Sequence, residues 1–289
     1  MQSDIRKPAT LQQQVEILKK KGLIVTDEKA AFKALRRVNY YRLSAYTSSL
    51  KESSFNGRFV EGTSFDQIFS LYEFDKKFRN LLLGILETFE ISLRSYLSYY
   101  FSHRYGSMGY LDPKNFEEER YHHTFVRVVR RGLARNDDLF SAGHRDQYKG
   151  NFPLWVVVEI LSFGDLSRFY ANMRSDDKRN FAKQYFQVPY IYLDSWLIVL
   201  SHVRNICAHY GRLYNRTLKY MPKLDKKDKG LGIRIDRVYA SIFVLHKLSP
   251  EGYEWDAFVT NLQTLLDFYK EVVELPLIGF PGRWNELLE

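Results

Sequence analysis

The sequence predicts an all-α protein, and three observations lead to this prediction. Apolar residues recur at offsets of three and four over most of the 289 residues, as they do on the buried face of a helix. Thr10 and Ser64 precede two such stretches in the position of an N-cap, and Gly22 and Gly106 follow them where a helix would end. No segment shows the sustained alternation of apolar and polar residues that is typical of a half-buried strand.

The N-terminal part should contain two short helices and a loop. The first helix begins at Thr10 and ends before Gly22, and the second covers residues 28–38. Residues 39–46 are dense in tyrosine. Residues 48–63 are polar and contain two glycines, which predicts a loop or a short hairpin.

A long helix should follow. Ser64 caps an apolar pattern that continues to about His103. Such length is unusual for a globular helix, so the pattern leaves open a kink near Gly84.

The remaining helices are read from the same periodicity. Residues 116–133 are acidic at their start and basic at their end, which matches a helix dipole. Residues 152–161 are apolar almost all round and predict a buried helix, after which Asp165 should cap the next one. A further helix should start at Ser175 or Asp176, and the next should carry the apolar run 193–203. Two more helices should cover residues 234–247 and 255–273. Loops are expected at residues 136–151, 221–232 and 276–284.

The composition favours a polyanionic partner. The formal net charge is +9, which attracts nucleic acid before membrane. The single cysteine, Cys207, rules out an intramolecular disulfide and suits a reducing compartment, and no cysteine cluster exists to bind zinc. The chain has no run of 18 apolar residues and no apolar signal core, so we expect a cytoplasmic protein without membrane contact. We also expect no cofactor and no bound metal.

Residues 204–216 are the strongest candidate for a functional site. They follow the apolar run 193–203, so Arg204 and His209 should lie near the end of a helix, with Gly211 as its stop. On a regular helix these two side chains lie about 140° apart and do not face each other. Either the helix unwinds just before Gly211, or a second copy of the chain presents its own motif opposite the first.

The residue types in this stretch suit RNA cleavage. Cleavage needs a base that removes the proton of the 2′-hydroxyl and an acid that protonates the leaving 5′-oxygen, and histidine can serve either step. Arg204 can hold the scissile phosphate and offset the charge that grows on its oxygens. Asn205, which shares a polar stripe with His202 and His209, can orient the histidine or donate to phosphate. This set requires no metal ion.

Two other interpretations of the motif remain open. In the first, it binds the RNA backbone, with Arg212 and Arg216 on its flank, and breaks no bond. In the second, it is structural: Arg204 pairs with Glu159 or Glu90 inside the bundle, and the histidine caps the helix.

A second basic cluster lies on the helix predicted at residues 116–133. Arg127, Arg130 and Arg131 either complement the helix dipole or form a phosphate-binding patch. His122 and His123 are adjacent rather than at a ligand spacing, and we interpret them as surface histidines.

Residues 204–209, together with 212–216, closely resemble the signature of the Abi family, abortive-infection proteins of the D/F type. The resemblance extends over residues 8–266, and its blocks occur in the expected order: 22–25, 39–44, 71–79, 90–94, 153–159 and 161–164. Arg42 and Arg94 lie in these blocks, and the resemblance assigns them no role.

The resemblance implies a fold and an activity. The family is placed in the HEPN superfamily of helical domains, whose Arg-x4–6-His motif acts in metal-independent RNA cleavage. Its members are bacterial, are linked to phage defence by growth arrest or death of the infected cell, and commonly form homodimers in which two motifs make one cleft. Some relatives are associated with a small non-coding RNA, which is therefore a candidate partner beside the target RNA. We expect an N-terminal helical segment at residues 1–62 and a HEPN-like helical domain at 63–289.

The matched positions carry expected roles. Arg204 would hold phosphate, Asn205 would assist and His209 would act as acid or base, while Glu159 would be a buried partner for a motif side chain. Further RNA contacts are expected at Arg127, Arg130, Arg131, Arg212 and Arg216. The resulting prediction is a metal-independent RNA endonuclease of an abortive-infection phage-defence system, and the alternative is an RNA-binding protein without catalytic activity.

Overall fold

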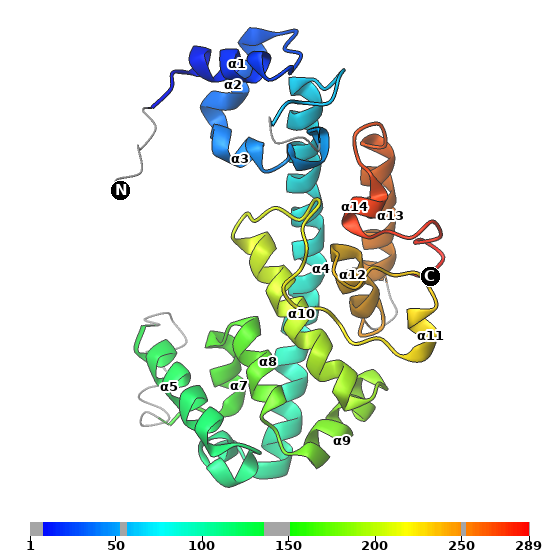
Figure 1. The fold of residues 1–289 in the computed structure, drawn as a ribbon. Helices are drawn as coiled ribbons and strands as arrows, with labels where there is room; N and C mark the ends of the chain where they lie inside the picture. Colours follow the sequence, from blue (N-terminus) through cyan, green and yellow to red (C-terminus); the bar gives the residue numbers. More distant parts are fainter. Residues whose placement is uncertain (1–7, 53–56, 136–150, 250–252, 289) are drawn as a thin grey trace, which may run out of the picture.

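Helices make up the regular structure of the chain, as the sequence predicts (Figure 1). The computed structural model describes residues 8–52, 57–135, 151–249 and 253–288. Within these ranges there is no strand, and pairing of the β type is limited to isolated bridges. The all-α fold class is confirmed. None of the helices in the same ranges has the length and apolar character needed to cross a membrane.

The central element is α4 (Phe65–Tyr105), a helix of 41 residues. Ser64 caps it, as predicted, by accepting a hydrogen bond from a backbone amide of the first turn at 3.1 Å. The helix is continuous through Gly84, so no break occurs where a kink was considered. Its buried side chains recur every three or four residues from Ile68 to Phe101. A helix of about 60 Å can therefore serve as a packing surface for most of the molecule.

Three helices near the N-terminus lie around the start of α4 (Figure 1): α1 (Leu11–Lys20), α2 (Glu28–Arg37) and α3 (Tyr40–Ser44). The first two confirm the predictions. The sequence did not predict α3, because five residues are too few to show a helical period. Asn39 begins α3 by accepting a hydrogen bond from the amide of Tyr41 at 2.7 Å.

The segment predicted as a loop or short hairpin contains a 3-10 turn and one antiparallel bridge in its described part. A 3-10 turn, η1 (Ser48–Leu50), precedes an isolated antiparallel bridge between Lys51 and Phe59. Residues 53–56 lie outside the described ranges.

Four helices lie at the second half of α4 (Figure 1), with α5 (Glu119–Arg135) outermost and α7 (Leu154–Val157), α8 (Phe163–Ala171) and α9 (Ser175–Phe186) nearer to it. The helix predicted from residue 116 starts later, because Phe116 forms an isolated bridge with Met173. Two 3-10 turns precede it, η2 (Gly109–Leu111) and η3 (Pro113–Asn115). The loop predicted at 136–151 falls outside the described residues except for its last one.

The prediction of one buried helix at residues 152–161 was wrong. The segment divides into α7 and a 3-10 turn, η4 (Val158–Ile160), and Trp155 points partly to solvent. Ser162, rather than Asp165, is the N-cap of α8. Asp165 is the third residue of that helix and its side chain accepts a hydrogen bond from the Ser162 amide, which completes a capping box.

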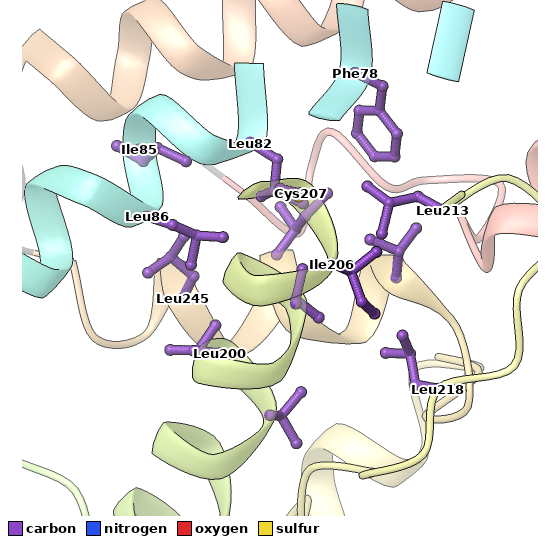
Figure 2. Close-up of a cluster of buried hydrophobic side chains, with 14 of the residues drawn as sticks. Phe78, Leu82, Ile85, Leu86, Leu200, Ile206, Cys207, Leu213, Leu218 and Leu245 are labelled. Atoms are coloured by element: carbon purple, nitrogen blue, oxygen red, sulfur yellow. The ribbon is translucent and has the colours of Figure 1, made fainter. Parts of the chain in front are cut away.

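The last part of the chain crosses back over α4 (Figure 1). It contains α10 (Tyr190–Ala208), α11 (Lys226–Lys229), α12 (Val238–His246), α13 (Tyr253–Phe268) and α14 (Leu275–Ile278). The short α11 and α14 lie in segments predicted as loops. Figure 2 shows Leu82 and Leu86 of α4 beside Leu200 and Cys207 of α10, with Leu245 of α12 completing the cluster. This packing fixes the end of α10, which carries the motif, against the middle of α4.

Candidate active site

A buried carboxylate on α4 holds the first residue of the motif. Arg204, on the last turn of α10, binds Glu90 through Nε at 2.9 Å, and the Glu90 side chain is only 4% exposed. Arg94 binds the other carboxylate oxygen through Nη2 at 2.7 Å. Arg94 also donates to the carbonyls of Val158 at 3.0 Å and Leu161 at 2.7 Å. Two guanidinium groups therefore share one carboxylate, and Arg94 ties it to η4.

The ion pair leaves most of the Arg204 guanidinium available. Its side chain is 32% exposed, and its ion pair with Glu90 is made through Nε. Its two terminal nitrogens make no hydrogen bond to any described residue. A guanidinium donates in a fixed planar fork, and free terminal groups of this kind can bind an oxyanion by two parallel hydrogen bonds.

His209 lies directly after the helix that carries Arg204. It is the C-cap of α10, with φ −97° and ψ 20°, and its amide donates to the Asn205 carbonyl at 3.0 Å. The side chain is exposed, and its imidazole makes no hydrogen bond or ion pair with the described part of the chain. No hydrogen bond joins it to Arg204. The helix remains regular to Ala208, so unwinding ahead of the histidine does not bring the two groups together.

The turn after His209 differs from the one predicted. The amide of Tyr210 donates to the Cys207 carbonyl at 3.1 Å, and the amide of Gly211 donates to the Ile206 carbonyl at 2.8 Å. This pair of bonds is a Schellman motif, in which the left-handed residue stands first after the cap. That residue is Tyr210, with φ 58°, and not Gly211. Gly211 packs so closely on Ile206 that an added Cβ would lie 3.0 Å from its methyl carbon.

An arginine from α3 stabilises this turn. Arg42 Nη1 donates to the Tyr210 carbonyl at 2.7 Å, across a separation of 168 residues in the sequence. Arg42 thus binds the carbonyl of the residue that follows His209, and this contact gives it a positioning role that the sequence left unassigned.

A second buried carboxylate on α4 holds the chain beyond the turn. Asp75, which has no solvent exposure, accepts hydrogen bonds from the amides of Leu213 at 3.1 Å and Tyr214 at 2.7 Å. It also accepts from the Tyr46 hydroxyl at 2.7 Å and forms an ion pair with Arg79. Burial raises the pKa of the Asp75 carboxyl, while Arg79 and the hydrogen-bond donors act against that rise.

The arginines that follow the motif are engaged with their own loop. Arg212 is half-buried and donates to the carbonyls of Tyr214 and Asn215, and burial lowers its pKa. Arg216 donates to the Arg212 carbonyl at 3.3 Å. These bonds shape the segment that Asp75 anchors, although both side chains keep some exposure.

The other polar side chains of α10 have distinct surroundings. Asn205 is half-buried, and its side-chain amide makes no hydrogen bond to the described residues. The ring of His202 packs edge-on against Tyr220, with centroids 5.1 Å apart, and its Nε2 is buried without a partner among the described residues. Burial, followed by the nearby cations Arg216 and Lys219, lowers the pKa of His202. It is therefore neutral at pH 7.

Cys207 lies under the site and is chemically silent. It is buried, and burial raises the pKa of its thiol to about 12. A thiol at neutral pH is a poor nucleophile.

The arginines of α5 do not contact the motif but lie on an element connected to it. Arg127, Arg130 and Arg131 are exposed. Near the end of the same helix, Gly132 lies against Ile160 of η4, where an added Cβ would be 2.9 Å from Ile160 Cδ1. The η4 turn in turn binds Arg94 through a carbonyl.

Two expectations about histidine and glutamate were wrong. Glu159 is exposed and makes no ion pair with a described residue, because the short α7 and η4 turn it outward; Glu90 is the carboxylate that binds Arg204. His122 is buried beside Phe116, and its Nε2 lies 3.0 Å from the Tyr110 carbonyl, whereas His123 is exposed.

The sequence did not predict the roles of Asp75 and Arg42. Both lie in blocks that resemble the Abi family, and their position in those blocks was the only signal for them.

Comparison with known proteins identifies a family. A family model described as "Abi-like protein" matches residues 33–215, which is more than half of the chain and includes α4, α10 and the motif as far as Asn215. No curated protein matches the chain. No solved structure matches it either.

Proposed function

The chain belongs to the Abi-like family, and from this premise we propose that it is a metal-independent RNA endonuclease of an abortive-infection defence system. The observation that carries the proposal is the arrangement at the end of α10. Glu90 anchors Arg204 by Nε and leaves its terminal nitrogens available, and the exposed imidazole of His209 follows five residues later.

The proposed reaction is an attack of the 2′-hydroxyl on the adjacent phosphate. A neutral imidazole removes the hydroxyl proton, the 2′-oxygen forms a bond to phosphorus, and the bond from phosphorus to the 5′-oxygen breaks. An imidazolium returns a proton to that 5′-oxygen. Arg204 stabilises the charge on the non-bridging oxygens, and Asn205 donates to phosphate or orients the histidine. These steps use no metal ion.

The reaction has two proton-transfer roles, and each chain supplies one exposed motif histidine. We therefore propose a homodimer in which the partner copy presents its own motif across a shared cleft. The missing hydrogen bond between Arg204 and His209 within one chain supports this arrangement. Light scattering at micromolar concentration should give twice the chain mass of 34.3 kDa. An active monomer would rule out the shared cleft.

We also propose that residues 63–289 form a HEPN-type domain and that residues 1–62 precede it as a helical segment. The support is the combination of a long central helix with a helix that crosses it and ends in the motif (Figure 1).

The main experiment measures cleavage of a labelled RNA by purified protein in the presence of a metal chelator. The parent should cleave, and Arg204→Ala and His209→Ala should each lower the rate at least about 100-fold. Arg179→Ala and His103→Ala are the matched controls, because both side chains are exposed on helices away from the motif. Their rates should equal that of the parent.

The same measurement separates the two functional classes. If both motif variants cleave as fast as the parent, the endonuclease is wrong. If the parent leaves the RNA intact but binds it tightly and in a salt-sensitive manner, the chain is a binding protein that uses the same motif.

A further inference from the structure

The backbone of Tyr210 adopts a conformation that normally belongs to glycine. Its φ of 58° lies in the left-handed region, where a side chain clashes with the following carbonyl. The first position after a helix cap is the usual place for glycine, and this chain has a tyrosine there. A turn selected only to end a helix would gain stability from glycine at residue 210. A strained residue that persists beside a candidate active site points to a role for its side chain.

The ring of Tyr210 is free to meet a ligand. It is 70% exposed, it makes no ring contact with a described residue, and it follows His209 directly. The Arg42 bond to its carbonyl and the Schellman bonds hold the backbone in place. The ring is therefore presented from a fixed turn rather than from a loose loop.

A second exposed tyrosine lies on the helix that contacts the same turn. Tyr41 on α3 is 84% exposed, the highest exposure among the large apolar and aromatic side chains of the described residues. Its neighbour Arg42 reaches the Tyr210 carbonyl, so Tyr41 lies one residue from the contact that joins α3 to the motif. An exposed tyrosine ring offers a flat face on which a nucleic-acid base can stack.

We propose that Tyr210 and Tyr41 form a stacking platform for two unpaired bases of the RNA, and that the substrate is consequently single-stranded. This inference rests on the proposed function and adds the substrate class. Every base has a flat face that can stack on a tyrosine ring, whereas a base in a duplex has both faces covered by its neighbours. The platform therefore selects single-stranded over double-stranded RNA and tolerates most base sequences.

The test is binding of RNA that cannot be cleaved. A labelled oligonucleotide with 2′-O-methyl riboses lacks the attacking hydroxyl, so its affinity can be measured whether or not the protein is a nuclease. The parent should bind the single strand more tightly than a duplex of the same sequence. Tyr210→Gly and Tyr41→Ala should each raise the Kd for the single strand at least about fivefold, and Tyr210→Phe should keep parental affinity.

The matched control is Gln187→Gly. Gln187 also has a left-handed backbone, with φ 54°, at the C-cap of α9, and its side chain is exposed. Both glycine substitutions remove the same kind of strain, so neither should lower the Tm, and only Tyr210→Gly should weaken RNA binding. A reduced affinity of a folded Tyr210→Gly protein can then be assigned to the lost ring.

Three outcomes decide the matter. Parental affinity in Tyr210→Gly and Tyr41→Ala, or equal affinity of the parent for single strand and duplex, overturns the platform while leaving the nuclease intact. Lost affinity in the tyrosine variants supports the platform even if the parent cleaves no RNA, in which case only the nuclease is wrong. Equal loss in Gln187→Gly would also overturn the platform, because it would trace the effect to the backbone.

Discussion

Glu90 binds two arginines that differ in how far they reach into solvent. Arg94 is 13% exposed and also donates to two carbonyls at residues 158 and 161, whereas Arg204 is 32% exposed and pairs with Glu90 through Nε. The two arginines that bind this carboxylate therefore have different surroundings. Arg94 belongs to the packing of the bundle, and Arg204 belongs to the surface where a phosphate would arrive.

Arg94→Ala should lower the free energy of unfolding by about 3 kcal/mol, since it leaves buried carbonyls and part of a buried carboxylate without a donor. Arg204→Ala should cost about 1 kcal/mol or less, because its ion pair is partly solvated and Arg94 still binds Glu90. Urea denaturation of both variants measures the difference. A larger loss in Arg204→Ala than in Arg94→Ala would contradict this division.

His122 should make the stability of the protein depend on pH. Burial lowers its pKa from 6.5, although the Tyr110 carbonyl acts in the opposite direction. Its Nδ1 is buried without a hydrogen-bond partner among the described residues, so the charged ring would place a proton where nothing accepts it. The unfolded chain therefore takes up this proton first as the pH falls. The contribution is complete above about pH 6.5 and is lost as the pH falls through the folded-state pKa.

Unfolding free energies from urea titrations at pH 7.5 and 5.5 would measure this dependence. The parent should be less stable at the lower pH, and His122→Gln should lose less stability over the same interval. An unchanged difference between the two pH values in His122→Gln would show that other groups cause the effect.

At the scale of elements, α4 is the part that positions the motif. Asp75 and Glu90 are 15 residues apart on it, which corresponds to about 22 Å along the axis. Glu90 holds the last turn of α10, and Asp75 holds the chain after the turn. One rigid helix thus sets the geometry of both sides of His209.

Asp75→Asn should damage both stability and activity. The substitution removes the charge opposite the buried Arg79 and one acceptor from a carboxylate that receives four donors. We expect a loss of about 3 kcal/mol in unfolding free energy, together with slower RNA cleavage. Asp176→Asn is the matched control, because Asp176 is exposed and pairs only with Arg179. A change within about 0.5 kcal/mol for Asp75→Asn would contradict the anchoring role.

The limits of prediction from sequence follow from these same elements. Helix positions were readable because the 3.6-residue period is a local signal, and the long pattern after Ser64 gave α4 nearly to its end. Glu90 was one of two residues considered as the ion-pair partner of Arg204. It could be considered because it is an acidic residue in a block that resembles the Abi family. The contacts of Arg42 and Asp75 cross 168 and 138 residues, and no local pattern records a partner that distant. Tyr210 was missed as the helix stop because the adjacent glycine is the ordinary choice.

At the scale of the whole molecule, the net charge of +9 should appear in the salt dependence of RNA binding. If α5 contacts the same RNA as the motif, replacing Arg127, Arg130 and Arg131 together by alanine should reduce the slope of log Kd against log salt by about 2, since each phosphate contact to a single strand contributes about 0.7. A fluorescence anisotropy titration at several salt concentrations gives the slope. These side chains are exposed, so the Tm should not change. An unchanged slope would mean that α5 only complements its own dipole.

The Arg42 bond to the Tyr210 carbonyl has a consequence for any shortened version of this chain. Arg42 and Tyr46 both precede residue 63. Arg42 donates a hydrogen bond to the turn beside His209, and Tyr46 donates one to the Asp75 carboxylate. A fragment that starts at residue 63 would keep every motif residue and lose two of the ties that shape it. The first helices therefore help to shape the candidate site, and minimal versions of this protein should be designed to retain them.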